Sequence, residues 1–265
     1  MKKMMGRREA QVLAYLQMHR KATLRAGELM APFQLTRKQE RELVHRMVRS
    51  GVIVRVRRGL YLAPPQMPLG VVWSPDEATA LAALMEDCRG RFQVCGPNAF
   101  NRYGFDEQIP NRVYVYNNRI YGERTIGAVA LTLIKVADER LGNTEPLEAG
   151  GVTLPYSSRA RTLVDAVYDW SRFDGLPRAF QWIRAELKAQ RVSAAELVRL
   201  ALRYGDIGTI RRIGALLDRE GVPSRVLGRL ERALKPSKSL ILWIPTRPKR
   251  GTVDRRWGVL WNDQA

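Results

Sequence analysis

Residues 36–63, TRKQERELVHRMVRSGVIVRVRRGLYLA, constrain the fold more than any other part of the chain. Up to Arg49 the apolar residues recur at helical spacing, and beyond Gly51 they alternate with polar ones, as in a half-buried strand. Arg58-Gly59 then provides a turn, and residues 60–62 return as a second strand. A basic helix followed by a two-stranded hairpin is how a winged helix-turn-helix ends. The pattern therefore predicts a DNA-binding module at the N-terminus.

Two earlier segments supply the remaining helices of such a module. Residues 7–20, RREAQVLAYLQMHR, carry apolar residues along one helical face and predict the first helix. Leu24–Met30 is expected to form a second, short helix. The third helix begins at Thr36, because Thr-x-x-Gln is a capping box that satisfies two otherwise unpaired amides. Gly51 is expected to end this helix as its C-cap.

Cationic side chains gather on the third helix and on the hairpin. Those in the first turns of the helix are placed to reach base edges, since Arg pairs with guanine and Gln with adenine. Those further along the helix and on the hairpin are expected to meet phosphates or a minor groove. The expected DNA-binding residues are Arg37, Lys38, Gln39, Arg41, Arg46, Arg49, Arg55, Arg57 and Arg58.

Charge is concentrated in the same region. Residues 1–65 hold fifteen basic and four acidic residues, a net charge of +11 out of +19 for the whole chain. This excess favours a polyanionic partner for the N-terminal quarter. Winged helices also serve as protein-interaction modules without DNA, but the arginine density on both helix and hairpin favours DNA.

Other classes of protein lack support in the sequence. Cys88 and Cys95 form no CxxC pair, and the two histidines are distant, so no zinc-site spacing exists. We expect no metal and no cofactor, with the cysteines as apolar core residues. The apolar run Ile126–Val136 is too short to span a bilayer, and polar residues 6–9 stand where a signal peptide needs an apolar segment. The expected location is the cytoplasm, away from the membrane.

Residues 64–70, PPQMPLG, are the expected domain boundary, because this segment suits neither a helix nor a central strand. The expected domains are 1–65 and 71–265. A helix is expected to open at Ser74 as N-cap, with Pro75 at its first position. Strands are predicted at 92–96, 112–118, 125–136 (two strands, or one bent at Gly127), 151–156, 239–245 and 256–261. Further helices are predicted at 98–103, 160–169, 176–190, 193–204, 206–220 and 224–234. Mixed strands followed by helices predict an α+β domain.

Five short blocks occur along the chain in a characteristic order. They are Arg57-Arg58-Gly59-Leu60-Tyr61, Gly96-Pro97-Asn98-Ala99, Gly104-Phe105-Asp106-Glu107-Gln108-Ile109-Pro110, Arg161-Thr162-Leu163-Val164-Asp165, and Gly251, Trp257 and Asn262 near the end. In this order they resemble the AbiEi-type antitoxin family of bacterial type IV toxin–antitoxin systems, over most of the chain. Asn98 replaces the usual Ser, and Phe105-Asp106-Glu107 replaces the commoner Leu-Thr-Glu.

The resemblance implies a winged helix-turn-helix that represses its own operon by binding inverted repeats in double-stranded DNA. It also implies a C-terminal domain that contributes cooperative DNA binding and neutralises a nucleotidyltransferase-like toxin without a stable complex. The residues alone leave another function open, a winged-helix regulator with a ligand-sensing or dimerising C-terminal domain.

The remaining polar motifs favour structural roles. Arg161 and Asp165 have ordinary i, i+4 salt-bridge spacing. Glu186-Leu187-Lys188 matches the Glu-x-Lys of nucleases, but in a helix these side chains point to different faces. No catalytic triad or phosphate-binding loop is present, so we expect no enzyme. Two basic clusters are either solvated surface or auxiliary DNA contacts: Arg211 with Arg212, and Lys249 with Arg250.

Overall fold

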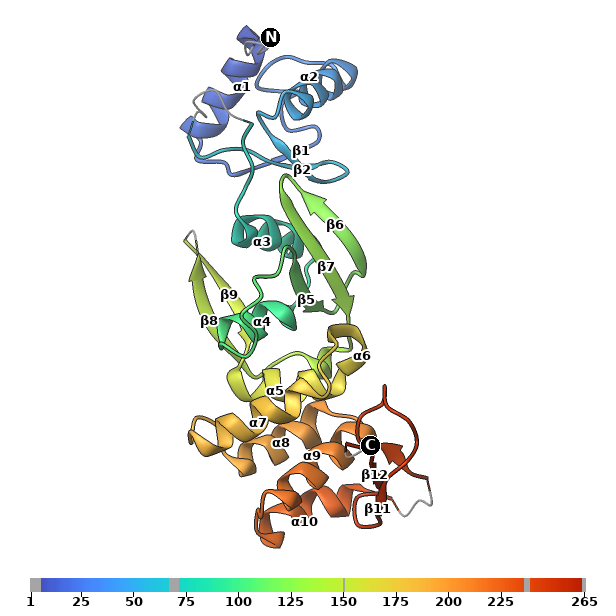
Figure 1. Cartoon of the computed structure of the whole chain (residues 1–265). Helices are drawn as coiled ribbons and strands as arrows, with labels where there is room; N and C mark the ends of the chain where they lie inside the picture. The colour runs from blue at the N-terminus through green and yellow to red at the C-terminus, as the bar shows by residue number, and fades with distance from the viewer. Residues whose placement is uncertain (1–5, 67–71, 150, 236–238, 264–265) are drawn as a thin grey trace. The chain divides into compact units, whose positions relative to one another are not determined.

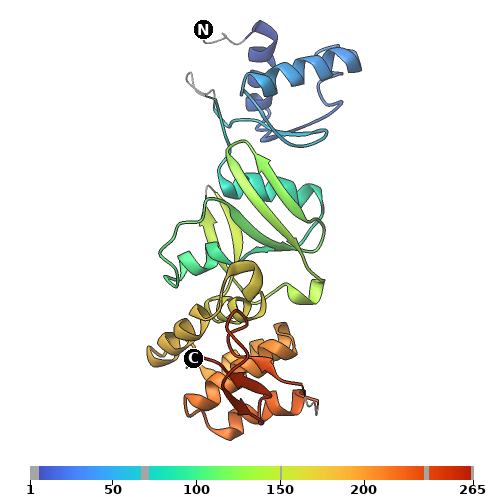
Figure 2. The same cartoon turned by 45° about the vertical axis from the view of Figure 1, so that its right-hand side comes forward.

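The computed structural model describes residues 6–66, 72–149, 151–235 and 239–263. Contacts divide the chain into two compact units. Unit 1 comprises Met1–Phe92, Asn111–Lys135 and Pro146–Leu154, and unit 2 comprises Gln93–Pro110, Val136–Glu145 and Pro155–Ala265. Both units contain helices and strands, as Figures 1 and 2 show, and the expected α+β class is confirmed.

The N-terminal part of unit 1 has the expected winged helix-turn-helix. Its elements are α1 (Arg7–Met18), β1 (Thr23–Arg25), α2 (Arg37–Arg49), β2 (Val54–Arg57) and β3 (Leu60–Leu62). The three strands form an antiparallel sheet in the order β1-β3-β2, drawn in blue in Figure 1. A continuous apolar core from both helices and the strands includes Val12, Leu13, Leu16, Leu24, Leu29, Leu43 and Met47. The strands β2 and β3 with their turn are the wing.

The predicted helix at Leu24–Met30 is wrong. Its first residues belong to strand β1, where Leu24 pairs with Tyr61 of the wing, and turns follow. Gly27 has a φ of +93°, which no right-handed helix allows. Pairing with a strand distant in the sequence, which no local pattern reveals, overrides the helical spacing of the apolar residues.

The N-cap of α2 is the one that the sequence predicts, whereas the C-cap differs by one residue. The Thr36 hydroxyl accepts the Gln39 amide hydrogen at 3.3 Å, and Gln39 Oε1 accepts the Thr36 amide hydrogen at 2.9 Å. At the other end Ser50 is the C-cap, and Gly51 follows it with a φ of +72°. The predicted C-cap is thus wrong by one residue: Ser50 caps the helix, and Gly51 is the residue after it, where the left-handed conformation requires glycine.

The rest of unit 1 contains α3 (Glu77–Asp87) and the strands β5 (Val113–Asn117), β6 (Gly122–Ile126) and β7 (Val129–Lys135). Strand β7 runs parallel to β5 and antiparallel to β6. Of the two alternatives for residues 125–136, two strands is the correct one: residues 125–126 end β6, Gly127 lies in the turn at a φ of +63°, and β7 follows. The expected boundary segment 64–70 lies outside the described residues from position 67 onward.

The predicted N-cap of α3 is wrong by two residues. Asp76 caps the helix, accepting the Thr79 amide hydrogen at 2.8 Å. The Ser74 hydroxyl instead accepts the amide hydrogen of Ala128 in the β6–β7 turn at 2.8 Å. Ser and Asp are both favoured N-cap residues. Because the Ser74 hydroxyl is hydrogen-bonded to the β6–β7 turn, Asp76 caps the helix.

The unit boundaries pass through two neighbouring strands, β8 (Thr144–Ala149) and β9 (Val152–Ser157). The sequence predicts β9 but not β8, whose mostly polar residues and Pro146 give no strand signal. Within unit 2 a parallel pairing joins Val94 of β4 (Phe92–Val94) to Tyr156 of β9.

Unit 2 is mainly helical. Its helices are α4 (Pro97–Arg102), the short 3-10 helix at Asp138–Arg140, α5 (Arg159–Tyr168), α6 (Trp170–Phe173), α7 (Arg178–Lys188), α8 (Ala194–Tyr204), α9 (Ile207–Arg219) and α10 (Ser224–Ala233). A small sheet near the C-terminus has the order β10-β12-β11, from Ile241–Leu242, Val259–Trp261 and Thr252–Asp254. The sequence patterns predicted neither α6, β11 nor the 3-10 helix at Asp138–Arg140.

The predicted strand at 256–261 begins only at Val259. Trp257 lies ahead of it, is fully buried, and donates its indole N–H to Asp218 at 2.9 Å. The ring packs against Gly214 of α9 so closely that a Cβ atom at that position would overlap it. Because Gly214 has no side chain, the C-terminal segment can pack closely on α9.

Gly214→Ala is expected to lower the free energy of unfolding by about 1–3 kcal/mol, the usual cost of overpacking a filled core. Urea denaturation followed by tryptophan fluorescence measures it. Gly228→Ala on α10 is the matched control, because a Cβ atom there meets only the far end of Glu231. That variant is expected to be neutral or more stable by up to about 1 kcal/mol, since alanine favours helix. Equal midpoints for both variants would contradict the packing argument.

Candidate nucleic-acid interface

A groove of 940 Å³ lies between the first turns of α2 and the tip of the wing. Arg37, Lys38 and Arg41 line it from the helix, and Arg58 lines it from the wing. The three helical residues lie together because positions i, i+1 and i+4 share one side of a helix. The buried residues Leu43 and Met47 hold the opposite side of α2 in the core. Amphipathic packing thus presents a cationic side of the helix to solvent.

All nine predicted DNA-binding residues have exposed side chains. Arg37, Lys38, Arg41, Arg55 and Arg58 have no acidic partner within ion-pair distance among the described residues. These five cations are free to meet a polyanion. The other predicted cations already have neighbours within the chain.

Arg46, whose side chain is half exposed, lies 3.8 Å from the carboxylate of Glu9, a long contact of small energetic weight. Arg49 lies 3.3 Å from Nδ1 of the exposed His45. Gln39 uses its Oε1 in the capping box, which is the same atom that would accept the adenine amino group. Reading adenine through Gln39 therefore competes with the cap of α2.

Glu40 is buried beneath the groove, at 4% exposure, and it fixes the turn that the sequence predicted as a helix. Its carboxylate accepts the amide hydrogens of Gly27 at 2.7 Å and of Leu29 at 2.9 Å. Glu40 shares the buried side of α2 with Leu43, Val44 and Met47. The structure shows that a helical carboxylate replaces the missing second helix as the support of this segment.

Arg57 of the wing differs from its neighbour Arg58. Its Nε–H donates to Asp87, the last residue of α3, and Arg25 of β1 donates to the same carboxylate at 2.6 Å. Hydrogen bonding from Arg57 is the main cause that holds the pKa of Asp87 below its ordinary value. We name these three residues the Asp87 clamp. Sequence reasoning missed Arg25 and Asp87, because nothing local links positions 25, 57 and 87.

The predicted surface cluster of Arg211 and Arg212 is wrong, because both side chains are buried in unit 2, at 5% and 8% exposure. Arg211 donates to the carbonyl oxygen of Ser239 at 3.0 Å, and Arg212 donates to that of Leu242 at 3.0 Å. Burial lowers the pKa of Arg212. The pair supports the small C-terminal sheet and is not available to DNA. Lys249 and Arg250, by contrast, are exposed.

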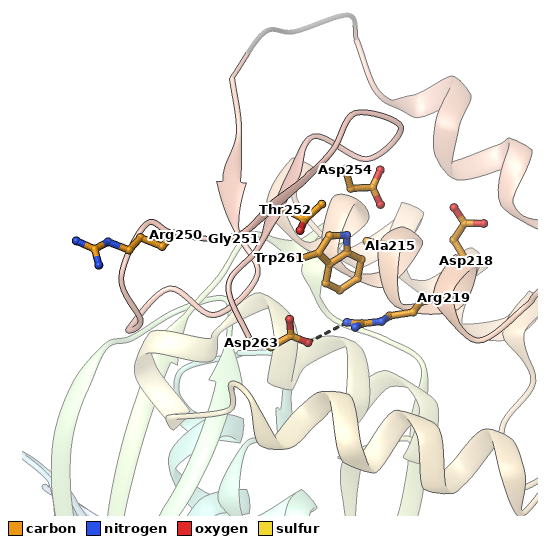
Figure 3. A pocket seen from close by; sticks show the side chains of 9 residues that line it. All are labelled: Ala215, Asp218, Arg219, Arg250, Gly251, Thr252, Asp254, Trp261 and Asp263. Carbon is orange, nitrogen blue, oxygen red and sulfur yellow. Dashed lines mark hydrogen bonds and ion pairs between the residues drawn. The ribbon is translucent and has the colours of Figure 1, made fainter. Parts of the chain in front are cut away.

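A second hollow, of 630 Å³, lies in unit 2 beside the small sheet (Figure 3). Trp261 and the carboxylates of Asp218, Asp254 and Asp263 line it together with Arg219. Asp263 accepts a hydrogen bond from Arg219 at 2.8 Å through Oδ2, while its Oδ1 is buried without a donor among the described residues. The other two carboxylates also accept hydrogen bonds within the chain, Asp218 from the Trp257 indole and Asp254 from the Trp257 amide.

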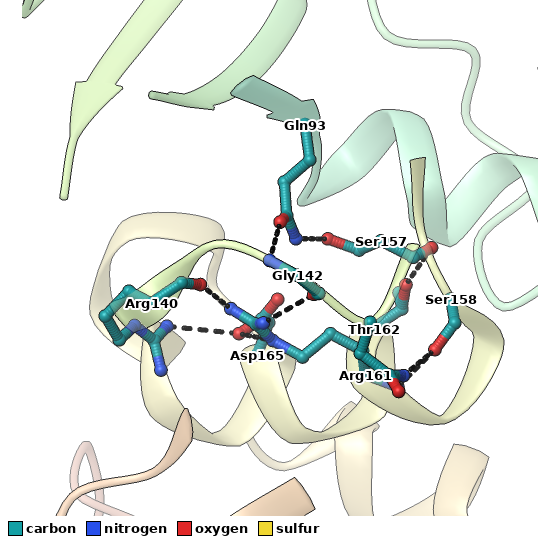
Figure 4. A network of polar contacts seen from close by, with 9 residues as sticks. Gln93, Arg140, Gly142, Ser157, Ser158, Arg161, Thr162 and Asp165 are labelled. Carbon is teal, nitrogen blue, oxygen red and sulfur yellow. Dashed lines mark hydrogen bonds and ion pairs between the residues drawn. The ribbon is translucent and has the colours of Figure 1, made fainter. Parts of the chain in front are cut away.

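Arg161 and Asp165 form a buried network, drawn in Figure 4. Arg161 Nε lies 2.9 Å from Asp165 Oδ1, with side chains 0% and 1% exposed. The remaining guanidinium nitrogens donate to the carbonyl oxygens of Gly142 at 3.0 Å and Arg140 at 2.9 Å. The structural interpretation of this motif is confirmed: one arginine ties α5 to the segment before β8.

Glu186 is likewise enclosed, at 2% exposure, and accepts hydrogen bonds from Arg159 and Arg191. Desolvation raises its pKa, but these guanidinium groups outweigh that effect and lower it overall. No group of three His, Cys, Asp or Glu side chains suited to a metal ion occurs among the described residues. Nor does any described helix have the length and apolar character needed to cross a bilayer.

The groove lies within a segment that matches a known protein family. Residues 11–64 match the family described as "Transcriptional regulator, AbiEi antitoxin". The crystal structure of the RV2827C protein from Mycobacterium tuberculosis aligns with 97% of this chain and 92% of that chain, with a TM-score of 0.61. Only 16% of residues are identical, so this likeness concerns the fold alone. No curated protein matches the sequence.

Proposed function

We propose that the chain is the DNA-binding antitoxin and transcriptional autorepressor of a bacterial type IV toxin–antitoxin operon, acting in the cytoplasm. The observation that carries the proposal is the groove between α2 and the wing, whose cations lie within the residues that match the antitoxin regulator family. Free arginine and lysine side chains on both sides of a groove are what a phosphate backbone requires. The toxin would be nucleotidyltransferase-like and neutralised without a stable complex.

The contacts in this proposal divide by position. Arg37, Lys38 and Arg41 in the first turns of α2 read base edges in the major groove, because a recognition helix enters it by its N-terminal residues. Arg55 and Arg58 of the wing hold the phosphate backbone, and Arg46 and Arg49 contact phosphates further along. Residues 1–65 form the DNA-binding domain and 71–265 the antitoxin domain. Lys249 and Arg250 provide auxiliary phosphate contacts. No catalytic role is proposed.

The DNA part of the proposal is tested by titrating the full-length chain with the duplex upstream of its own gene. It should bind this duplex at lower concentration than a random duplex of equal length. The logarithm of the binding constant should fall with the logarithm of salt concentration by about 0.9 for each phosphate contacted. Equal binding to both duplexes at every salt concentration would refute the proposal that the upstream duplex contains an operator.

The antitoxin part is tested in cells that express the neighbouring gene. Growth should recover when this chain is co-expressed, and it should also recover with a variant that carries alanine at Lys38 and Arg41, if neutralisation depends on residues 71–265. Death of the cells with and without the chain would refute the antitoxin role while leaving DNA binding intact.

A second function is supported by the hollow of unit 2. A winged-helix regulator whose C-terminal part senses a ligand needs a site such as the one formed by Trp261 and Asp263. This alternative predicts that a small molecule releases the chain from its operator. Two results together would reject this alternative. The chain would stay bound to the upstream duplex when metabolites from a cell extract are added, and it would rescue cells from the toxin.

A further inference from the structure

The Asp87 clamp brings one carboxylate and two guanidinium groups together from three elements of unit 1. Asp87 ends α3, Arg25 belongs to β1 and Arg57 to β2. The carboxylate is 3% exposed, whereas the side chains of Arg25 and Arg57 are 61% and 46% exposed. The acid thus lies beneath two cations whose outer edges face solvent.

The position of Asp87 explains why this pairing is strong. The C-terminus of a helix carries a partial negative charge, so a carboxylate there is unfavourable unless cations offset it. The last turn of α3 contains no basic residue of its own. Arg25 and Arg57 supply the missing positive charge from the winged helix, and a charge-assisted pair to a buried carboxylate is worth more than an exposed one.

The same pairing weakens the wing as a phosphate ligand. A carboxylate within hydrogen-bond distance cancels part of the attraction that its partner exerts on a second anion. The two arginines and Asp87 have a net charge of +1, whereas the arginines alone have +2. Arg58, one residue further along the wing, is exposed and has no such acid beside it among the described residues.

We infer that Asp87 is an internal competitor of the DNA backbone: its carboxylate occupies Arg57 of the wing and Arg25 of β1, which a phosphate would otherwise take. The competition lowers the affinity for any duplex and leaves base reading by α2 unchanged. Occupancy of the operator then depends more on Arg37, Lys38 and Arg41, which carry the sequence information. This inference rests on the proposed function, since it concerns the same interface.

The variant Asp87→Asn removes the charge and keeps the size of the side chain. It is expected to bind both the upstream and the random duplex more tightly, by about three- to tenfold at low salt. Its salt dependence should steepen by about 0.9 for each additional phosphate that the wing binds. Glu86→Gln is the matched control, because it changes the net charge equally at an exposed neighbouring position. Its effect should be clearly smaller.

A loss of affinity by Asp87→Asn at an unchanged melting temperature would overturn the inference and make Asp87 a support of the wing. Equal gains in Asp87→Asn and Glu86→Gln would overturn it as well, since net charge alone would then account for them. If Asp87→Asn unfolds, the comparison of Arg57→Ala with Arg58→Ala tests the inference instead. Arg57→Ala should lower the affinity for DNA less than Arg58→Ala does, because Asp87 already occupies Arg57. Equal losses of affinity would contradict the inference. Equal binding of both duplexes by the wild-type chain would refute the proposed operator. The comparisons between variants would still hold, because they can be made on either duplex.

Discussion

The chain that carries Lys38→Ala and Arg41→Ala will lose most of its preference for the upstream duplex over a random one. Each good contact to a base edge is worth about 1–3 kcal/mol of discrimination, so removal of both is expected to cost on the order of thirtyfold or more in the ratio of the two affinities. Both side chains line the groove and neither has an acidic partner among the described residues. Titration of both duplexes at several salt concentrations measures the effect.

The matched control for this prediction is Arg55→Ala with Arg58→Ala, which removes the same charge from the wing. It should weaken binding to both duplexes by the same factor. The salt dependence should flatten by about 0.9 for each phosphate that the wing no longer binds. Arg57 is left in place because the Asp87 clamp already holds it. If both double variants weaken both duplexes equally, the assignment of base reading to α2 and of phosphate binding to the wing is wrong.

Asp165→Ala is expected to be the most destabilising single substitution in unit 2. Removing one partner of a buried pair leaves an uncompensated charge and costs about 3–5 kcal/mol. Here the stranded group is Arg161, which is 0% exposed and also stacks at 3.8 Å on the ring of Tyr204. Urea denaturation of the full chain, followed by tryptophan fluorescence, should show the loss as a lower midpoint.

Glu196→Ala provides the comparison, because Glu196 pairs with Arg199 at 3.8 Å on the exposed side of α8. A surface pair of this kind contributes about 0–1 kcal/mol. The two variants remove the same charge from the same unit, so a difference between them reports burial. Similar midpoints would show that the Arg161 network is dispensable for folding.

The two predictions separate the roles of charge in a strongly basic chain. On α2 and the wing, arginines without acidic partners are available to a polyanion. In unit 2, Arg161, Arg211 and Arg212 are buried and donate to carbonyl oxygens and to Asp165. The same residue type is thus available for recognition on one surface and serves packing in one interior, and burial decides which.

The local chemistry of residues 36–63 determined most of the N-terminal winged helix-turn-helix. The capping box at Thr36, the helical spacing along α2 and the alternation in β2 each depend on residues a few positions apart, so they can be read from the sequence. Exposure of the nine predicted residues follows from the same periodicities. For this reason the fold of the module and its cationic face were predictable.

Only the tertiary structure decided what depends on residues distant along the chain. Pairing of β1 with β3 and the buried Glu40 replaced the expected helix with turns. Packing against the C-terminal sheet buried Arg211 and Arg212, and Asp87 took Arg57 from the set of free cations. Each outcome depends on which groups meet across the fold, and the free energy of a buried or paired charge depends on those neighbours and not on its sequence position.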